Sequence, residues 1–188
     1  MTREVFFTLE TAVALTGALV FARAAAFKLR DVEAFADALA AYRILPIGLV
    51  EVTARALPVA EIVCALALLA PPTCAAGEVA AAALLVVFAL AMGVNLLRGR
   101  REIDCGCGDP SRRHPLAWSF VVRNLAFAAA LGSSALAPAR SGSLVEWAVG
   151  AAAAAGLMLL MLCHETFSAL PAREGRGAPP LLRLGDPA

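Results

Sequence analysis

Residues 78–97 read EVAAAALLVVFALAMGVNLL, and this stretch decides the fold. At about 1.5 Å of rise per residue, a helix of twenty residues covers about 30 Å, which is the thickness of the hydrocarbon core of a bilayer. Only its first residue, Glu78, is charged. The stretch therefore predicts a helix that crosses a membrane.

The composition of the whole chain agrees with this prediction. Of its 188 residues, 61% are apolar and 16% are charged, whereas soluble domains have about 45–50% and 25%. Sixteen basic residues nearly balance fifteen acidic ones, for a net charge of +1, so the basic excess of a nucleic-acid-binding protein is absent. We expect one membrane-embedded domain over residues 1–170. Residues 171–188, rich in Pro, Gly and Arg, are predicted to form a disordered cytoplasmic tail.

Four other runs have membrane-crossing length, so five crossings are expected. The run over residues 50–70 is the least regular, because it carries three charges and Pro58. We still count it as a crossing, because otherwise its apolar half would have no apolar surroundings. Residues 28–45 place apolar side chains at helical spacing between charged ones, which predicts an amphipathic helix lying at the bilayer surface. The expected fold is an all-α bundle of about five transmembrane helices, with a four-helix core and one interfacial helix. The other three runs are residues 5–27, 116–137 and 144–163.

The basic residues predict the orientation. With five crossings, eleven of them fall on one side and only two, Arg3 and Arg140, on the other. Cytoplasmic loops carry the excess of Lys and Arg, so the amino terminus is predicted outside and the carboxyl terminus in the cytoplasm. The eleven are Lys28, Arg30, Arg43, Arg98, Arg100, Arg101, Arg112, Arg113, Arg173, Arg176 and Arg183.

Polar residues inside the predicted spans need partners. Arg123 and Asn124 lie well within the run 116–137, and a charge in the bilayer is costly unless it is paired. Glu61 and Glu10 are the expected partners of Arg123, whereas Arg23 is expected to reach the headgroups. Two interpretations stay open for these groups: structural ion pairs, or a path for protons or substrate.

The segment Asp104-Cys105-Gly106-Cys107-Gly108 is the strongest chemical signal. Glycines permit the backbone angles that bring two sulfurs one residue apart into reach, and a bridge in so small a ring is expected to exchange readily. This favours Cys105 and Cys107 as the reactive pair of a thiol-disulfide oxidoreductase. A metal site of Cys105, Cys107, His114 and an acidic residue fits no zinc spacing well, and an inert loop is the third interpretation.

Three more cysteines, Cys64, Cys74 and Cys163, are weaker signals, because unpaired Cys is often simply buried. Their predicted depths differ, so they are candidates for a relay of thiol exchange between the two faces.

Several segments together resemble the MauE family of methylamine utilisation proteins, which is related to DoxX-like membrane proteins. The resemblance covers about residues 5–165. It rests on Phe27-Lys28-Leu29-Arg30-Asp31, Tyr42-Arg43-Ile44-Leu45-Pro46, Leu57-Pro58-Val59-Ala60-Glu61, Asp104-Cys105-Gly106-Cys107-Gly108 and Arg123-Asn124.

The resemblance implies a protein of the bacterial inner membrane that supports maturation of the methylamine dehydrogenase beta subunit, a disulfide-rich periplasmic protein. It implies a thioredoxin-like partner of the MauD type. We expect no cofactor. Cys105 and Cys107 match the family's cysteine motif, and Glu61, Arg123 and Asn124 match its intramembrane polar positions. Two other classes stay open: a scaffold or chaperone without redox chemistry, and a small carrier or quinone-linked oxidoreductase.

The implied client and the predicted orientation conflict, because the charge rule places Cys105 and Cys107 in the cytoplasm. Either Cys64 and Cys74 help to relay electrons across the membrane, or the orientation is inverted. The charge asymmetry favours the relay.

Overall fold

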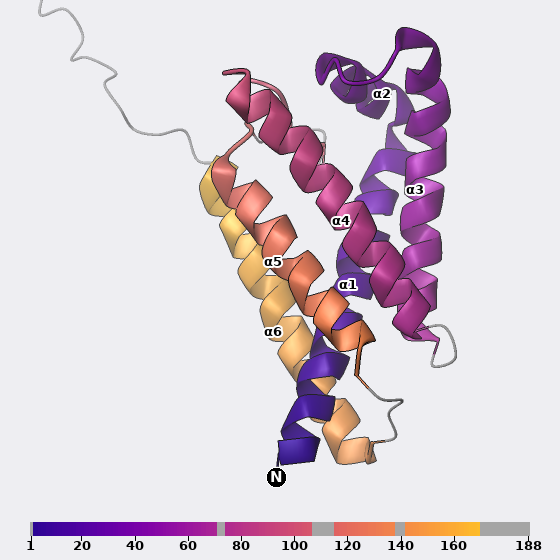
Figure 1. Cartoon of the computed structure of the whole chain (residues 1–188), viewed down its shortest axis with the longest axis vertical. Coiled ribbons are helices and arrows are strands. Elements are labelled where there is room, and N and C mark those ends of the chain that lie inside the picture. The colour runs from indigo at the N-terminus through magenta and orange to yellow at the C-terminus, as the bar shows by residue number, and fades with distance from the viewer. Residues whose placement is uncertain (1, 71–73, 107–114, 138–141, 170–188) are drawn as a thin grey trace, which may run out of the picture.

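The computed structural model describes residues 2–70, 74–106, 115–137 and 142–169. The regular structure in these ranges is helical, apart from one isolated bridge between Asp104 and Pro115, so the all-α prediction is confirmed (Figure 1). The helices are α1 (Thr2–Arg30), α2 (Val32–Ala41), α3 (Ile47–Leu69), α4 (Cys74–Leu97), α5 (Trp118–Ala135) and α6 (Leu144–Ala169).

The boundary between α1 and α2 corrects the predicted amphipathic helix over residues 28–45. Helix α1 continues to Arg30, and Asp31 breaks it because its carboxylate accepts the backbone N–H of Ala34 at 2.9 Å and caps α2. Lys28 therefore belongs to α1, where its side chain is buried in the bundle. The prediction placed Lys28 in the segment that follows the first span, whereas the structure places it in the last turn of α1.

The five long helices alternate in direction, so the amino-terminal end of α1 and the carboxyl-terminal end of α6 lie at opposite ends of the bundle (Figure 1). Four of them, α1, α3, α4 and α5, contribute the largest buried apolar cluster, which includes Phe21, Leu68, Leu85 and Leu131. Helix α6 packs on α1, and its Met161 packs against the edge of this cluster. Phe7 and Trp147 stack edge-on near the beginnings of the two helices, with ring centroids 5.6 Å apart.

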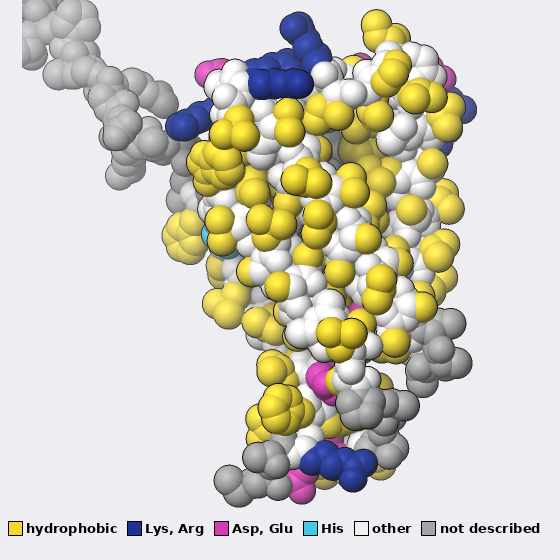
Figure 2. Space-filling view, viewed as in Figure 1, with side chains coloured by type: hydrophobic (Ala, Val, Ile, Leu, Met, Phe, Trp, Pro, Cys, Tyr) yellow, Lys and Arg dark blue, Asp and Glu magenta, His cyan; other side chains and the backbone are white. Residues whose placement is uncertain are grey.

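Within the described residues, four helices are long and apolar enough to cross a membrane: α1, α3, α4 and α6. The irregular run 50–70 is among them as α3. Helix α5 is not; its 18 residues cover about 27 Å, and they include Arg123 and Asn124. Apolar side chains cover the middle of the bundle and basic ones gather at its two ends (Figure 2). The chain is a multi-pass membrane protein.

Candidate functional site

The cysteine segment follows α4 in a turn whose base is fixed by the backbone. The N–H of Leu116 donates to the carbonyls of Arg101, at 3.0 Å, and Ile103, at 3.1 Å. Asp104 turns the chain, because its carboxylate accepts the N–H of Gly106 at 2.8 Å while Gly106 adopts φ +68°, which favours glycine. This turn presents Cys105 at the end of the bundle where α2 lies.

Cys105 is 9% exposed and belongs to an apolar cluster with Tyr42, Met92 and Phe120. The Tyr42 hydroxyl donates to the Cys105 carbonyl at 3.2 Å, which ties the turn to the end of α2. Cys105 is therefore held in a defined cluster and is largely shielded from solvent. Cys107, the predicted second member of the pair, lies outside the described residues.

The other predicted relay cysteines are far apart on the bundle. Cys74 begins α4, and Cys105 follows its far end, so about 36 Å of helix separates their levels. Cys64 is buried inside α3, whereas Cys163 is exposed on α6. Cys64, Cys74, Cys105 and Cys163 form no disulfide with one another.

Arg123 forms an ion pair inside the bundle, but its partner is not one of the two predicted glutamates. Arg123 Nη1 lies 3.3 Å from Glu165 Oε1, and Arg23 Nη1 lies 2.9 Å from Glu165 Oε2. One carboxylate on α6 thus bridges arginines from α5 and α1. The prediction that Glu61 or Glu10 pairs with Arg123 is wrong, and Arg23 pairs inside the bundle rather than reaching for the headgroups.

Glu61 pairs with Lys28 instead. Both side chains are buried, at 0% and 5% exposure, and the Lys28 ammonium donates to Glu61 Oε1. The Lys28 nitrogen also lies 5.3 Å from the centroid of Phe35 and 5.4 Å from that of Phe88, so two rings flank the cation. Glu61 Oε2 is buried and has no hydrogen-bond partner among the described residues.

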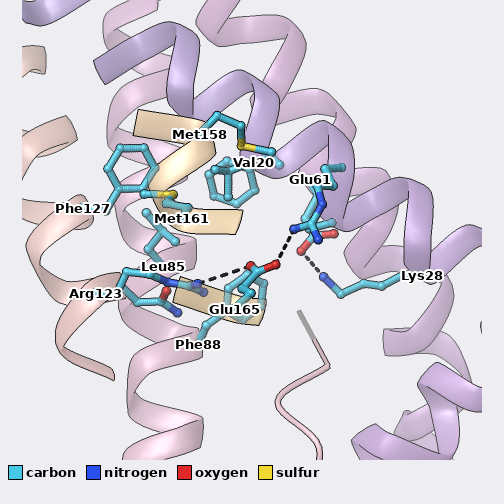
Figure 3. A pocket seen from close by; sticks show the side chains of 14 residues that line it. Val20, Lys28, Glu61, Leu85, Phe88, Arg123, Phe127, Met158, Met161 and Glu165 are labelled. Carbon is cyan, nitrogen blue, oxygen red and sulfur yellow. Dashed lines mark hydrogen bonds and ion pairs between the residues drawn. The ribbon is translucent and has the colours of Figure 1, made fainter. Parts of the chain in front are cut away.

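These charges line one cavity among α1, α3, α4, α5 and α6, shown in Figure 3. Its free space is about 40 Å³, enough for one or two water molecules. Three cations face two carboxylates, a formal balance of +1 among Arg23, Lys28, Arg123, Glu61 and Glu165. Asn124, which is 4% exposed, lines the same cavity.

A second buried carboxylate lies near the beginning of α4, and sequence reasoning missed it. Glu78 is 1% exposed and accepts a hydrogen bond from the Ser134 hydroxyl at 2.7 Å. The Cys74 thiol lies 3.8 Å from the same oxygen. Glu78 had been placed at the edge of a span, but α4 begins one turn earlier and carries it inside.

No cluster of three or more His, Cys, Asp or Glu side chains with metal-binding geometry occurs in the described ranges. Two of the residues in the metal interpretation, Cys107 and His114, lie outside these ranges.

An all-helical bundle with charges paired between membrane-crossing helices, and a cysteine turn at one end, defines a polytopic membrane protein with an intramembrane ion-pair cluster. The family profile described as methylamine utilisation protein MauE matches residues 6–137. The chain belongs to the MauE family.

Individual relatives agree over most of their length. The methylamine utilization protein MauE of Paracoccus denitrificans is 43% identical over 84% of this chain and 86% of the relative. The one of Methylophilus methylotrophus is 38% identical over 84% of each. No solved structure matches.

Proposed function

We propose that this protein supports methylamine utilisation by thiol-disulfide exchange at Cys105 and Cys107 during maturation of an exported protein. The single observation that carries the proposal is the defined turn at Cys105, which fixes one thiol at the end of a membrane bundle. Membership in the MauE family, whose curated relatives are named for methylamine utilization, supports the pathway.

In the proposed step, a thiolate of the client or of a thioredoxin-like partner attacks the Cys105–Cys107 disulfide and forms a mixed disulfide. A second thiolate of that protein then resolves it. The partner gains a disulfide, and Cys105 and Cys107 become thiols, so two electrons move from the partner to the pair. The methylamine dehydrogenase beta subunit is the proposed client, and a MauD-type protein is the proposed partner.

We propose five crossings of the bacterial inner membrane, with α5 as the fifth. The alternation of helix direction supports this, because α5 runs from the end of the bundle where α4 finishes to the end where α6 begins (Figure 1). The basic excess supports an outer amino terminus, which places Cys105 on the cytoplasmic side. In that orientation electrons must cross the membrane, and Cys64 and Cys74 are the proposed relay, although Cys74 and Cys105 differ in level by about 36 Å in this arrangement. If the orientation is inverted, the turn meets its partner directly.

Replacement of both thiols tests the exchange step. Cells whose own copy is deleted receive the Cys105→Ser/Cys107→Ser variant, and the client's thiols are counted by gel shift with a thiol reagent. We expect reduced client to accumulate and methylamine dehydrogenase activity to be lost, because no mixed disulfide can form. The Ser133→Ala variant is the matched control, since this exposed side chain on α5 belongs neither to the pair nor to the proposed relay.

Normal client disulfides in cells with the double variant, at a normal level of the protein in the membrane, would refute the exchange step. The scaffold interpretation would then explain the family's role. Loss in the control equal to that in the double variant would also refute a special role for the Cys105 turn.

A further inference from the structure

A second cavity lies between α2, α3, α4 and the Cys105 turn. Most of the residues that line it do not line the charged cavity. It holds about 210 Å³, below the range of about 300–1,000 Å³ of drug-sized ligand sites. A single substituted ring would fill it. Its lining is almost wholly apolar and includes Phe35, Tyr42, Leu57, Phe88, Met92 and Cys105.

Aromatic side chains and one cation give the cavity its character. Phe35 and Phe88 come from different helices and both line it, and a planar ring packs well against such faces. Lys28 lines it too, with its ammonium beside both phenyl rings. The ammonium has three N–H donors, of which Glu61 Oε1 receives one. The cavity therefore offers donors to a flat molecule that carries acceptor oxygens.

The rim of the cavity opens toward the apolar surface. Ile44, between α2 and α3, and Val87, on α4, line it and are 45% and 56% exposed. A ligand with a hydrocarbon tail would keep that tail in the lipid while its ring enters. The occupant that the geometry fits is lipid-soluble, planar and rich in acceptor oxygens.

We propose that this cavity binds the ring of a membrane quinone, which reoxidises the Cys105–Cys107 dithiol. This inference rests on the proposed exchange function, because it supplies the oxidant that the exchange step needs. Cys105 is the redox group in the wall of the cavity, and Cys107 supplies the second thiol. The two thiols lose two protons and two electrons and form one S–S bond, and the quinone gains both and becomes the quinol.

Lys28 positions the ring in this step. Its ammonium donates a hydrogen bond to one quinone oxygen and stabilises the negative charge that develops there. The ion pair with Glu61, which lines the charged cavity, keeps the Lys28 ammonium in place. A lipid-soluble acceptor works whichever face of the membrane carries Cys105, because the quinol diffuses within the bilayer.

The test uses the full chain in lipid nanodiscs with decylubiquinone as the probe. Anaerobic, pre-reduced protein is expected to bind the probe saturably and to reduce one quinone per Cys105–Cys107 pair, measured by ultraviolet absorbance. The Cys105→Ser/Cys107→Ser variant is expected to bind the probe and to reduce none of it.

A matched pair of variants on α2 tests the cavity itself. Ala38 lines the cavity and Ala40 is exposed on the same helix. Ala38→Phe fills the space and is expected to weaken binding by about tenfold or more, while Ala40→Phe leaves it within about twofold.

Absence of saturable binding, or equal binding to both α2 variants, overturns the cavity as a quinone site. Failure of the pre-reduced protein to reduce the bound probe overturns the quinone as oxidant. Either result leaves the exchange function standing if the double serine variant still fails to oxidise its client in cells. Normal client disulfides in that variant refute the exchange function instead.

Discussion

Single buried charges in this bundle are stable because each has a partner on another helix. The side chains of Lys28 of α1 and Glu61 of α3 are both buried in the bundle and form an ion pair. An unpaired charge in such a place costs several kcal/mol, whereas the complete pair is close to neutral for stability. The pair therefore contributes to the specificity of the α1–α3 contact more than to its strength.

Removing one partner is expected to cost more than removing both. Glu61→Leu leaves the Lys28 ammonium buried and unpaired, so we expect a loss of about 3–5 kcal/mol in the free energy of unfolding. Lys28→Met/Glu61→Leu is expected to recover to within about 1 kcal/mol of the parent, because two apolar side chains replace two charges. Unfolding in mixed micelles by sodium dodecyl sulfate, followed by circular dichroism, measures both.

Glu51→Gln provides the control for this comparison. Glu51 and Arg55 form a pair at 3.9 Å on the same helix, but their side chains are 80% and 75% exposed, so the change should cost less than about 1 kcal/mol. A double variant no more stable than Glu61→Leu would contradict the argument.

The ion-pair partner of Arg123 could not be identified from the sequence. The apolar run that predicts the last span ends at residue 163, so it does not include Glu165. Helix α6 instead continues to Ala169 and carries Glu165 to the level of Arg23 and Arg123. A span predicted from hydropathy ends at the first polar residues. The helix itself continues as long as its backbone hydrogen bonds form and its polar side chains find partners.

At the scale of helices, small residues set how closely neighbours approach. A Cβ atom built on Gly77 of α4 would lie 2.9 Å from both the carbonyl carbon and the Cβ of Ala67, and 3.0 Å from the nitrogen of Leu68. Backbone atoms cannot rotate away from such a contact. Gly77 therefore fixes the distance between α3 and α4 at the end opposite the cysteine turn.

Gly77→Ala should push these two helices apart. We expect it to lower the free energy of unfolding by about 1–3 kcal/mol, as overpacking does. Gly93→Ala on the same helix meets nothing within 4 Å, so its higher helix propensity should make it neutral or stabilising by up to about 1 kcal/mol. The same micelle titration compares the two, and equal stabilities would contradict the close contact.

For the short helix α2, the spacing of apolar residues predicts the helix but not the contacts that hold it in place. Its apolar spacing predicted a helix in this segment, and a helix is present. What fixes it was not visible: Arg100, after α4, donates to the carbonyls of Ala41, at 2.8 Å, and Tyr42, at 3.3 Å. That contact joins residues 58 or more positions apart, and charge counting had assigned Arg100 only to the basic excess.

At the scale of the whole molecule, the direction of each long helix determines which segments share a face. The beginnings of α1 and α6 meet at Phe7 and Trp147, while Arg23 and Glu165 meet toward their other ends. These two helices are therefore parallel, and the two ends of the described chain lie at opposite ends of the bundle.

Labelling at three positions tests this topology. In a background without native cysteines, Arg3→Cys and Ser143→Cys are expected to react with a membrane-impermeant maleimide in intact cells. Arg98→Cys is expected to react only after permeabilisation. All three positions are exposed, so a difference in labelling reports the side of the membrane rather than burial. Identical labelling of Arg98→Cys and Ser143→Cys would mean that α5 does not cross. Labelling of Arg98→Cys alone would invert the orientation and place the cysteine turn on the same side as an exported client, which removes the need for electrons to pass through Cys64 and Cys74.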